Sequence, residues 1–147
     1  MTTSIHDTLA RSYLVYFTLS IIGLFVDTFI GFEVTVASSQ YIAVVCFIIG
    51  TALIMWAQYT SRHRPKGKPE DPYFFRGPYR YMRNPTHLGI LILVTGYTAV
   101  SGSIVFFFVT VIGYLISNVF FGRYEAILDR TYGDDYKEYQ AKVPKIF

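Results

Sequence analysis

Four apolar runs constrain the fold of this chain more than any other feature of its sequence. They cover Tyr13–Ile30, Tyr41–Tyr59, Leu88–Val100 and Ser103–Phe121. A helix needs about 20 residues to cross a bilayer, and the first, second and fourth runs approach that length. The third run is shorter, but counting from Pro85 gives about 24 Å of helix at ~1.5 Å per residue. The runs predict an all-α integral membrane protein with four transmembrane helices.

The composition supports this prediction over a soluble helical bundle. Of the 147 residues, 52% are hydrophobic and only 16% are charged, whereas a soluble domain averages about 25% charged residues. The length suits one domain. We expect a single membrane domain, in which residues 1–59 form two N-terminal helices and residues 60–147 form a cofactor-binding loop, a helical hairpin and a C-terminal tail.

The placement of positive charge predicts the topology. All 13 lysines and arginines lie in three places: at Arg11, within 62–83 and within 123–145. Four crossings put these places on one side, which the positive-inside rule identifies as the cytoplasm. Both termini should therefore be cytoplasmic, and a prokaryotic inner membrane is the simplest location. The net charge of +3 then reflects topology and contact with anionic lipids, not nucleic-acid binding.

The N-terminus and the cysteine content suggest neither a cleaved signal peptide nor a disulfide or cysteine metal site. The N-terminus has no small-residue cleavage site, so we expect a retained first helix. Cys46 is the only cysteine, and the three histidines show no metal-ligand spacing. The sequence thus predicts no disulfide and no metal site.

A long, basic and aromatic loop separates the second and third runs. It spans Thr60–Asn84, whereas connections in compact domains have a median of about 4–6 residues. Its aromatic residues favour an ordered interface, with a simple aromatic belt as the alternative; they are Tyr73, Phe74, Phe75, Tyr79 and Tyr81. We expect this loop to be functional.

Local signals set the expected helix ends. Asn84 and Pro85 predict a helix start, with the Asn84 side chain as the cap and the positive end of the helix dipole suited to an anionic group. The tripeptide at 101–103 is short enough to require a tight hairpin between antiparallel helices. Gly133 and Pro144 should end two helical stretches of the tail.

Polar residues inside the apolar runs are few. Tyr114, Asn118 and Glu125 are spaced to share one helix face. Tyr114 and Asn118 are candidates for substrate contact, although contact between helices is an equal alternative for the asparagine. Asp27 lies near the outer end of its run, where we interpret it as an interfacial carboxylate.

Two motifs resemble the isoprenylcysteine carboxyl methyltransferase family and its phospholipid N-methyltransferase relatives. The stretch GPYRYMRNPTHLG, residues 77–89, resembles that family's GPYxxxRHPxYxG. The stretch YEAILDRTYGDDYKEYQAKVP, residues 124–144, resembles EExxLxxxFGxxYxxYxxxVP. Four positions depart from these patterns: Asn84 replaces His, His87 replaces Tyr, Tyr124 replaces Glu and Tyr132 replaces Phe. Together the motifs cover about the C-terminal half.

The resemblance implies a methyltransferase that uses S-adenosylmethionine and a lipophilic or prenylated acceptor from the bilayer. It implies catalytic roles for Arg83, His87 and Glu125. The residues implied in cofactor binding come from both motifs: Gly77, Pro78, Tyr79, Arg83, Asn84, Pro85, His87, Gly89, Glu125, Tyr136 and Tyr139. Because Asn84, His87 and Tyr124 fall among the positions that the resemblance expects to meet the cofactor or to position the substrate, the acceptor need not be prenylated cysteine.

Two other classes remain open from the sequence. A non-catalytic four-helix protein, such as a small transporter or assembly factor, would place charge near mid-membrane, where the chain offers only Asn118 and the peripheral Asp27. A lipid-modifying reductase would need a nicotinamide site, and the chain has no glycine-rich strand-to-helix fingerprint.

Overall fold

The computed structural model describes residues 5–31, 34, 39–62 and 75–145 of the chain. The described residues form five α-helices and one short 3-10 element, so the all-α prediction is confirmed. The elements are α1 (Ile5–Ile30), α2 (Ser39–Arg62), η2 (Gly77–Arg80), α3 (Pro85–Ser101), α4 (Ile104–Tyr132) and α5 (Asp134–Lys142). The prediction of order at Tyr73 and Phe74 falls outside the described residues.

Three of these helices are long and apolar enough to cross a bilayer. They are α1, α2 and α4, whose outward-facing side chains are large, hydrophobic and exposed, for example Phe17, Phe25 and Ile48. Side chains of this kind need lipid around them, so the chain is an integral membrane protein. Helix α3 has 17 residues, or about 25 Å at ~1.5 Å per residue. Its crossing of the bilayer stays a prediction.

The helix ends predicted from proline and glycine residues are confirmed. Helix α3 starts at Pro85 and ends before Gly102, whose φ of 63° is the left-handed conformation that favours glycine. Helix α4 ends before Gly133, and α5 ends at Lys142, two residues before Pro144. Two helices are longer than the apolar runs predicted. Helix α1 starts well before Tyr13, and α4 continues past Phe121 without a break.

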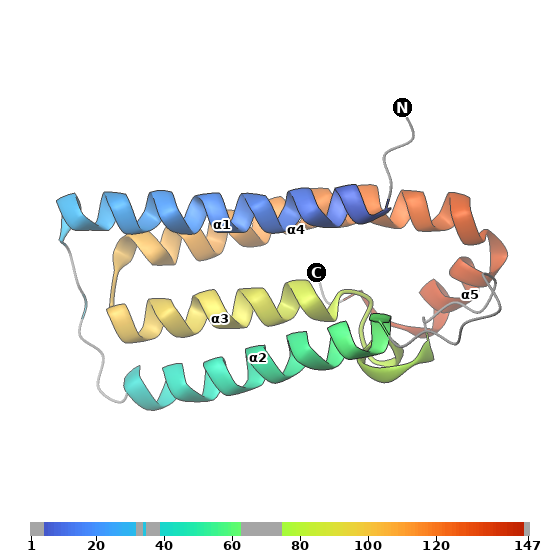
Figure 1. The fold of residues 1–147 in the computed structure, drawn as a ribbon, viewed down its shortest axis with the longest axis horizontal. Helices are drawn as coiled ribbons and strands as arrows, with labels where there is room; N and C mark the ends of the chain where they lie inside the picture. Colours follow the sequence, from blue (N-terminus) through green and yellow to red (C-terminus); the bar gives the residue numbers. More distant parts are fainter. Residues whose placement is uncertain (1–4, 32–33, 35–38, 63–74, 146–147) are drawn as a thin grey trace.

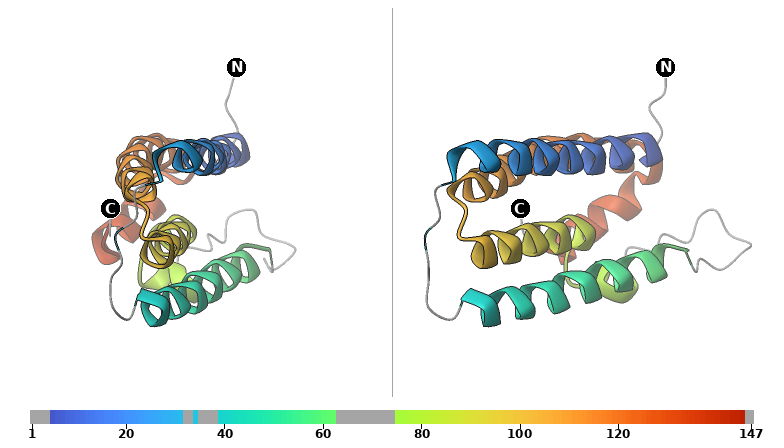
Figure 2. Two further views of the ribbon diagram at one scale, coloured as in Figure 1. Left: turned by 90° about the vertical axis from the view of Figure 1, so that its left-hand side faces the viewer. Right: turned by 60° about the vertical axis from the view of Figure 1, so that its left-hand side comes forward.

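The helices pack as two antiparallel pairs that the hairpin joins. Helix α1 lies along α4, and α2 lies along α3, as Figures 1 and 2 show from three directions. The hairpin after α3 connects the pairs at one end. Helix α5 and η2 lie at the opposite end (Figure 1), so residues of both sequence motifs gather there.

Small residues bring α2 and α3 into close contact. A Cβ atom on Gly50 would lie 2.8 Å from the carbonyl oxygen of Gly89, and one on Gly89 would lie 2.6 Å from Ile54 Cγ1. Farther along, a Cβ on Gly96 would lie 2.8 Å from Cys46 Cβ. Membrane helices associate through such close backbone approach because lipid supplies no hydrophobic drive. Gly89 therefore serves the helix contact.

The hairpin end of the bundle is fastened by polar contacts. Ser103 donates a hydrogen bond to Asp27 Oδ1 at 2.5 Å, and its hydroxyl also accepts from the Phe106 amide at the start of α4. The Val34 amide donates to the Gly102 carbonyl at 2.8 Å. Asp27 is thus more than the interfacial carboxylate expected from the sequence, because it holds α1 to the capping residue of α4.

The C-terminal tail folds back on the loop before α3. An aromatic cluster buries Phe121, Tyr124, Leu128, Tyr136, Tyr139 and Val143, with Tyr79 and Tyr132 packed against it. The Tyr139 hydroxyl donates to the Tyr79 carbonyl at 2.7 Å, and its ring meets Phe75 edge-on with centroids 5.4 Å apart. The tail therefore positions the loop that carries the first motif.

Replacing Gly50 tests the contact between α2 and α3. We expect Gly50→Ala to destabilise the protein by about 1–3 kcal/mol, because the added methyl group meets backbone and forces the helices apart. Thermal unfolding of the detergent-purified protein measures this. The matched control is Gly122→Ala, since a Cβ there has nothing within 4 Å. Equal unfolding temperatures for the two variants would contradict the contact.

Replacing Tyr139 tests the docking of the tail. Tyr139→Phe removes the hydrogen bond to the loop, a net contribution of about 1 kcal/mol, so amide hydrogen exchange in α5 should become faster. Lys137→Ala is the control, because the exposed Lys137–Asp134 pair should contribute nothing measurable. Unchanged exchange in Tyr139→Phe would show that the cluster alone holds the tail.

Candidate active site

An ion pair joins the two sequence motifs. Arg83, just before α3, donates through Nη1 to Glu125 Oε1 in the part of α4 beyond its apolar run. Their side chains are only 14% and 15% exposed, and Lys145 Nζ lies 3.9 Å from the other carboxylate oxygen. Since charge-assisted hydrogen bonds are about twice as strong as neutral ones, this pair fixes the end of α4 against the start of α3.

The element η2 shapes the approach to the ion pair. Gly77 has a φ of 52°, and a Cβ atom there would lie 2.2 Å from Thr60 Oγ1, so only glycine fits against the end of α2. Pro78 is fully buried, and the Tyr81 and Met82 amides donate to its carbonyl oxygen. These contacts set the turn that carries Tyr79 and Arg83 to the site.

A small cavity of about 30 Å³ adjoins the ion pair. It has room for roughly two water molecules, since one needs ~10–15 Å³ by this measure. Three elements contribute its lining: α1, the segment from η2 into α3, and α4. The lining residues are Tyr13, Tyr79, Arg83, Asn84, Pro85, Thr86, His87, Phe121 and Tyr124.

Asn84 occupies the position before α3 but does not cap the helix, so the predicted cap is wrong. Its ψ is 58°, whereas capping residues usually have an extended backbone, and its side chain makes no capping hydrogen bond. The residue is 4% exposed. Among the described residues, neither amide atom has a hydrogen-bond partner, and the same holds for Arg83 Nε.

His87 lies one turn into α3 between aromatic rings of α1. Its ring centroid is 5.6 Å from that of Tyr13 and 6.4 Å from that of Tyr16. The histidine is 5% exposed, and Tyr16 is itself anchored by donating to the Gly113 carbonyl at 3.0 Å. The imidazole is therefore held in a fixed place at the wall of the cavity.

The structure brings together only some of the residues that the sequence predicted for the site. Tyr79, Arg83, Asn84, Pro85 and His87 line the cavity, and Glu125 holds Arg83 beside it. The others lie elsewhere. Gly77 and Gly89 approach α2, Pro78 supports the turn, and Tyr136 and Tyr139 are 1% and 2% exposed in the aromatic cluster.

The two predicted substrate residues lie outside the cavity. Tyr114 is 40% exposed, and the Asn118 side chain donates to the Tyr114 carbonyl one turn back in its own helix, at 3.1 Å. Tyr13, Thr86, Phe121 and Tyr124 line the cavity and were not predicted as site residues. Of these, only Tyr124 gave a signal, as a departure from the second motif.

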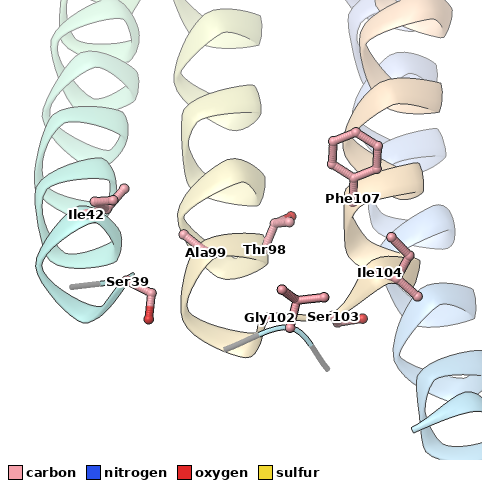
Figure 3. A pocket seen from close by; sticks show the side chains of 9 residues that line it. Ser39, Ile42, Thr98, Ala99, Gly102, Ser103, Ile104 and Phe107 are labelled. Atoms are coloured by element: carbon pink, nitrogen blue, oxygen red, sulfur yellow. The ribbon is translucent and has the colours of Figure 1, made fainter. Parts of the chain in front are cut away.

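A larger cavity, of about 300 Å³, lies at the hairpin end of the bundle. Figure 3 shows Ile42 of α2, Thr98 and Ala99 of α3, and Phe107 of α4 around it. The Thr98 hydroxyl already contacts Thr110 Oγ1 at 3.0 Å and donates to its own helix. Among the described residues, no acid, base or thiol lines this cavity, and the described lining suits an apolar chain.

One comparison with known proteins gave a match. The model of the phospholipid methyltransferase family matches residues 66–135, slightly less than half of the chain. This segment includes Arg83, Asn84, His87 and Glu125. Neither the curated proteins nor the solved structures gave a match. The match indicates that the chain is a membrane methyltransferase whose methyl donor is S-adenosylmethionine.

Proposed function

We propose that the protein transfers a methyl group from S-adenosylmethionine to a lipophilic acceptor at the end of the bundle that holds the Arg83–Glu125 pair. The observation that carries this proposal is a partly buried ion pair beside unpartnered polar atoms, at the border of three apolar helices. A water-soluble donor and a membrane-dissolved acceptor can meet only at such a border.

The residues around the ion pair fit the polar end of the donor. Its amino acid part carries an ammonium and a carboxylate group, for which Glu125 and Arg83 are complementary partners. Arg83 Nε has no partner among the described residues, so the guanidinium can donate further hydrogen bonds. The cavity of about 30 Å³ is much smaller than the donor, so the donor cannot lie within it as it stands.

The protein's own contribution to methyl transfer is positioning and the exclusion of water. When bound, the donor supplies a methyl group on a positively charged sulfur. Correct alignment of an acceptor with such a group can lower the barrier by about 7–11 kcal/mol. The buried walls formed by Pro85, Phe121 and Tyr124 keep bulk water from the reacting atoms.

The sequence motif and the family match each favour a class of acceptor. The first motif resembles that of isoprenylcysteine carboxyl methyltransferases, which favours a prenylated carboxylate. The family match favours a phospholipid amine. Both classes combine an apolar tail with a small polar head, and the exposed apolar surfaces of α1, α2 and α4 suit delivery of that tail through the bilayer.

Donor binding tests the proposed function. We expect the detergent-purified protein to bind S-adenosylhomocysteine in calorimetry, and Arg83→Ala and Glu125→Ala to weaken binding at least tenfold. The reason is that hydrogen bonds to charged groups contribute about 1.5–3 kcal/mol, and ~1.4 kcal/mol is a factor of ten in affinity.

The control for donor binding is a second ion pair of the same chemistry. Glu138 and Lys142 form an exposed pair on α5, with both side chains 60% exposed, so Glu138→Ala should leave the affinity unchanged. If the folded wild-type protein does not bind S-adenosylhomocysteine, the proposed function is wrong.

We also propose that the candidate site and both termini face the cytoplasm, which the clustering of lysine and arginine supports. In a Cys46→Ser background, a membrane-impermeant maleimide should label Ser101→Cys in intact cells. It should label Asp135→Cys, on exposed α5, only after the membrane is opened. The reverse pattern would invert the proposed topology.

A further inference from the structure

We propose that the small cavity is the acceptor subsite and that it takes a phenol-type hydroxyl group on an apolar tail. This inference rests on the proposed function, because it names the acceptor of the same site. It assigns Asn84 as the residue that recognises the hydroxyl and His87 as the group that receives its proton. Both residues depart from the first motif, so the inference concerns what distinguishes this chain.

Asn84 carries the argument because its amide is buried and unpartnered. It is 4% exposed, it borders the cavity, and neither Nδ2 nor Oδ1 has a partner among the described residues. A buried polar group without a partner is destabilising, because it has lost its hydrogen bonds to water. The usual partners for an asparagine before a helix are the backbone amides of the first turn, and Asn84 does not bind them. A ligand in the cavity would supply the missing hydrogen-bond partners of Nδ2 and Oδ1.

The hydrogen-bonding capacity of the amide selects the ligand. An asparagine side chain presents donors at Nδ2 and an acceptor at Oδ1. A hydroxyl group also donates once and accepts, so the two are complementary. A carboxylate only accepts and would leave Oδ1 facing negative charge. An ammonium only donates and would leave Nδ2 unsatisfied.

The charge balance of the site points the same way. Glu125 is already paired with Arg83 and lies 3.9 Å from Lys145. A cationic acceptor head would therefore enter a buried cavity beside Arg83 without a counter-charge of its own, and burying an unpaired charge is far more costly than burying a neutral polar group. The volume of about 30 Å³ has room for a neutral hydroxyl group that displaces water, and not for the ring that carries it.

A hydroxyl acceptor needs a base, and His87 lies at the cavity wall. In this reaction the phenolic oxygen forms a bond to the methyl carbon, and the phenolic proton passes to the His87 imidazole. The bond between that carbon and the donor sulfur breaks, and its electron pair stays on the sulfur. A phenol titrates near pH 10 and is far more acidic than an aliphatic alcohol, so among hydroxyl groups it needs the weakest base.

Helix α1 positions the His87 side chain through ring contacts. The rings of Tyr13 and Tyr16 pack against the imidazole, and the Tyr16 hydroxyl is fixed on Gly113 of α4. These tyrosines are positioning residues. They lie outside residues 66–135, the segment that matches the family, so the first helix completes the subsite.

Acceptors with the same tail and different heads test the inference. The wild-type protein in lipid nanodiscs is given radiolabelled S-adenosylmethionine with a long-chain 4-alkylphenol, alkyl carboxylate or alkylamine. We expect methylation of the phenol to exceed that of the other two at least tenfold in kcat/KM. Preferred methylation of the carboxylate or the amine would overturn the inference and leave the proposed function standing.

Variants assign the roles of the two residues. Asn84→Leu keeps the size of the side chain and should lower kcat/KM for the phenol at least tenfold, while S-adenosylhomocysteine binding persists. Gln140→Leu, on α5 away from the cavity, is the control. His87→Gln should lower kcat about 100-fold near neutral pH, the lower end of typical base contributions. The defect should shrink as the pH approaches 10, because the phenol then ionises unaided.

Two results separate failure of the inference from failure of the proposed function. Donor binding without methylation of the phenol would overturn the hydroxyl acceptor alone. Absence of donor binding in the folded wild-type protein would overturn both. A His87→Gln defect that stays constant across the pH range would overturn the assignment of His87 as the base.

Discussion

The ion pair between Arg83 and Glu125 is the interaction on which the functional end of the protein depends. It connects the start of α3 to the extension of α4, two segments that lie far apart in the sequence. The tail strengthens the connection, because α5 packs on the same part of α4 and Tyr139 binds the loop that carries Arg83. A break in the ion pair would therefore disturb donor binding and the shape of the cavity together.

The protein accepts a local energetic cost beside this ion pair. The amide of Asn84 and Nε of Arg83 are buried without a partner among the described residues, and each such group costs about 1–3 kcal/mol when dry. The close contact of α2 with α3 and the aromatic cluster of the tail offset that cost elsewhere. Polar groups left open in this way are typical of sites that are completed by a ligand.

Local chemistry made part of this structure predictable. Pro85, Gly102 and Gly133 set helix ends through backbone constraints that need no tertiary partner, and the apolar runs revealed three spans by length alone. Predictions failed where a distant contact decided the outcome. Asn84 was expected to cap α3, but its backbone is not in the extended conformation of capping residues and its side chain makes no capping hydrogen bond. The sequence could not predict that Tyr13 belongs to the site, because an aromatic residue in an apolar run can contact either lipid or another residue such as His87.

The two ends of the bundle are fastened by different means, and this has a mechanical consequence. At the hairpin end, Asp27 binds Ser103 and the Val34 amide binds Gly102, and close by a Cβ on Gly23 would collide with Val109 at 2.9 Å. The opposite end is held by the Arg83–Glu125 pair, by the docked tail and by the close approach of Gly77 to the end of α2. If the two helix pairs tilted about the hairpin end, their separation would increase most at the opposite end, where we propose that donor and acceptor meet.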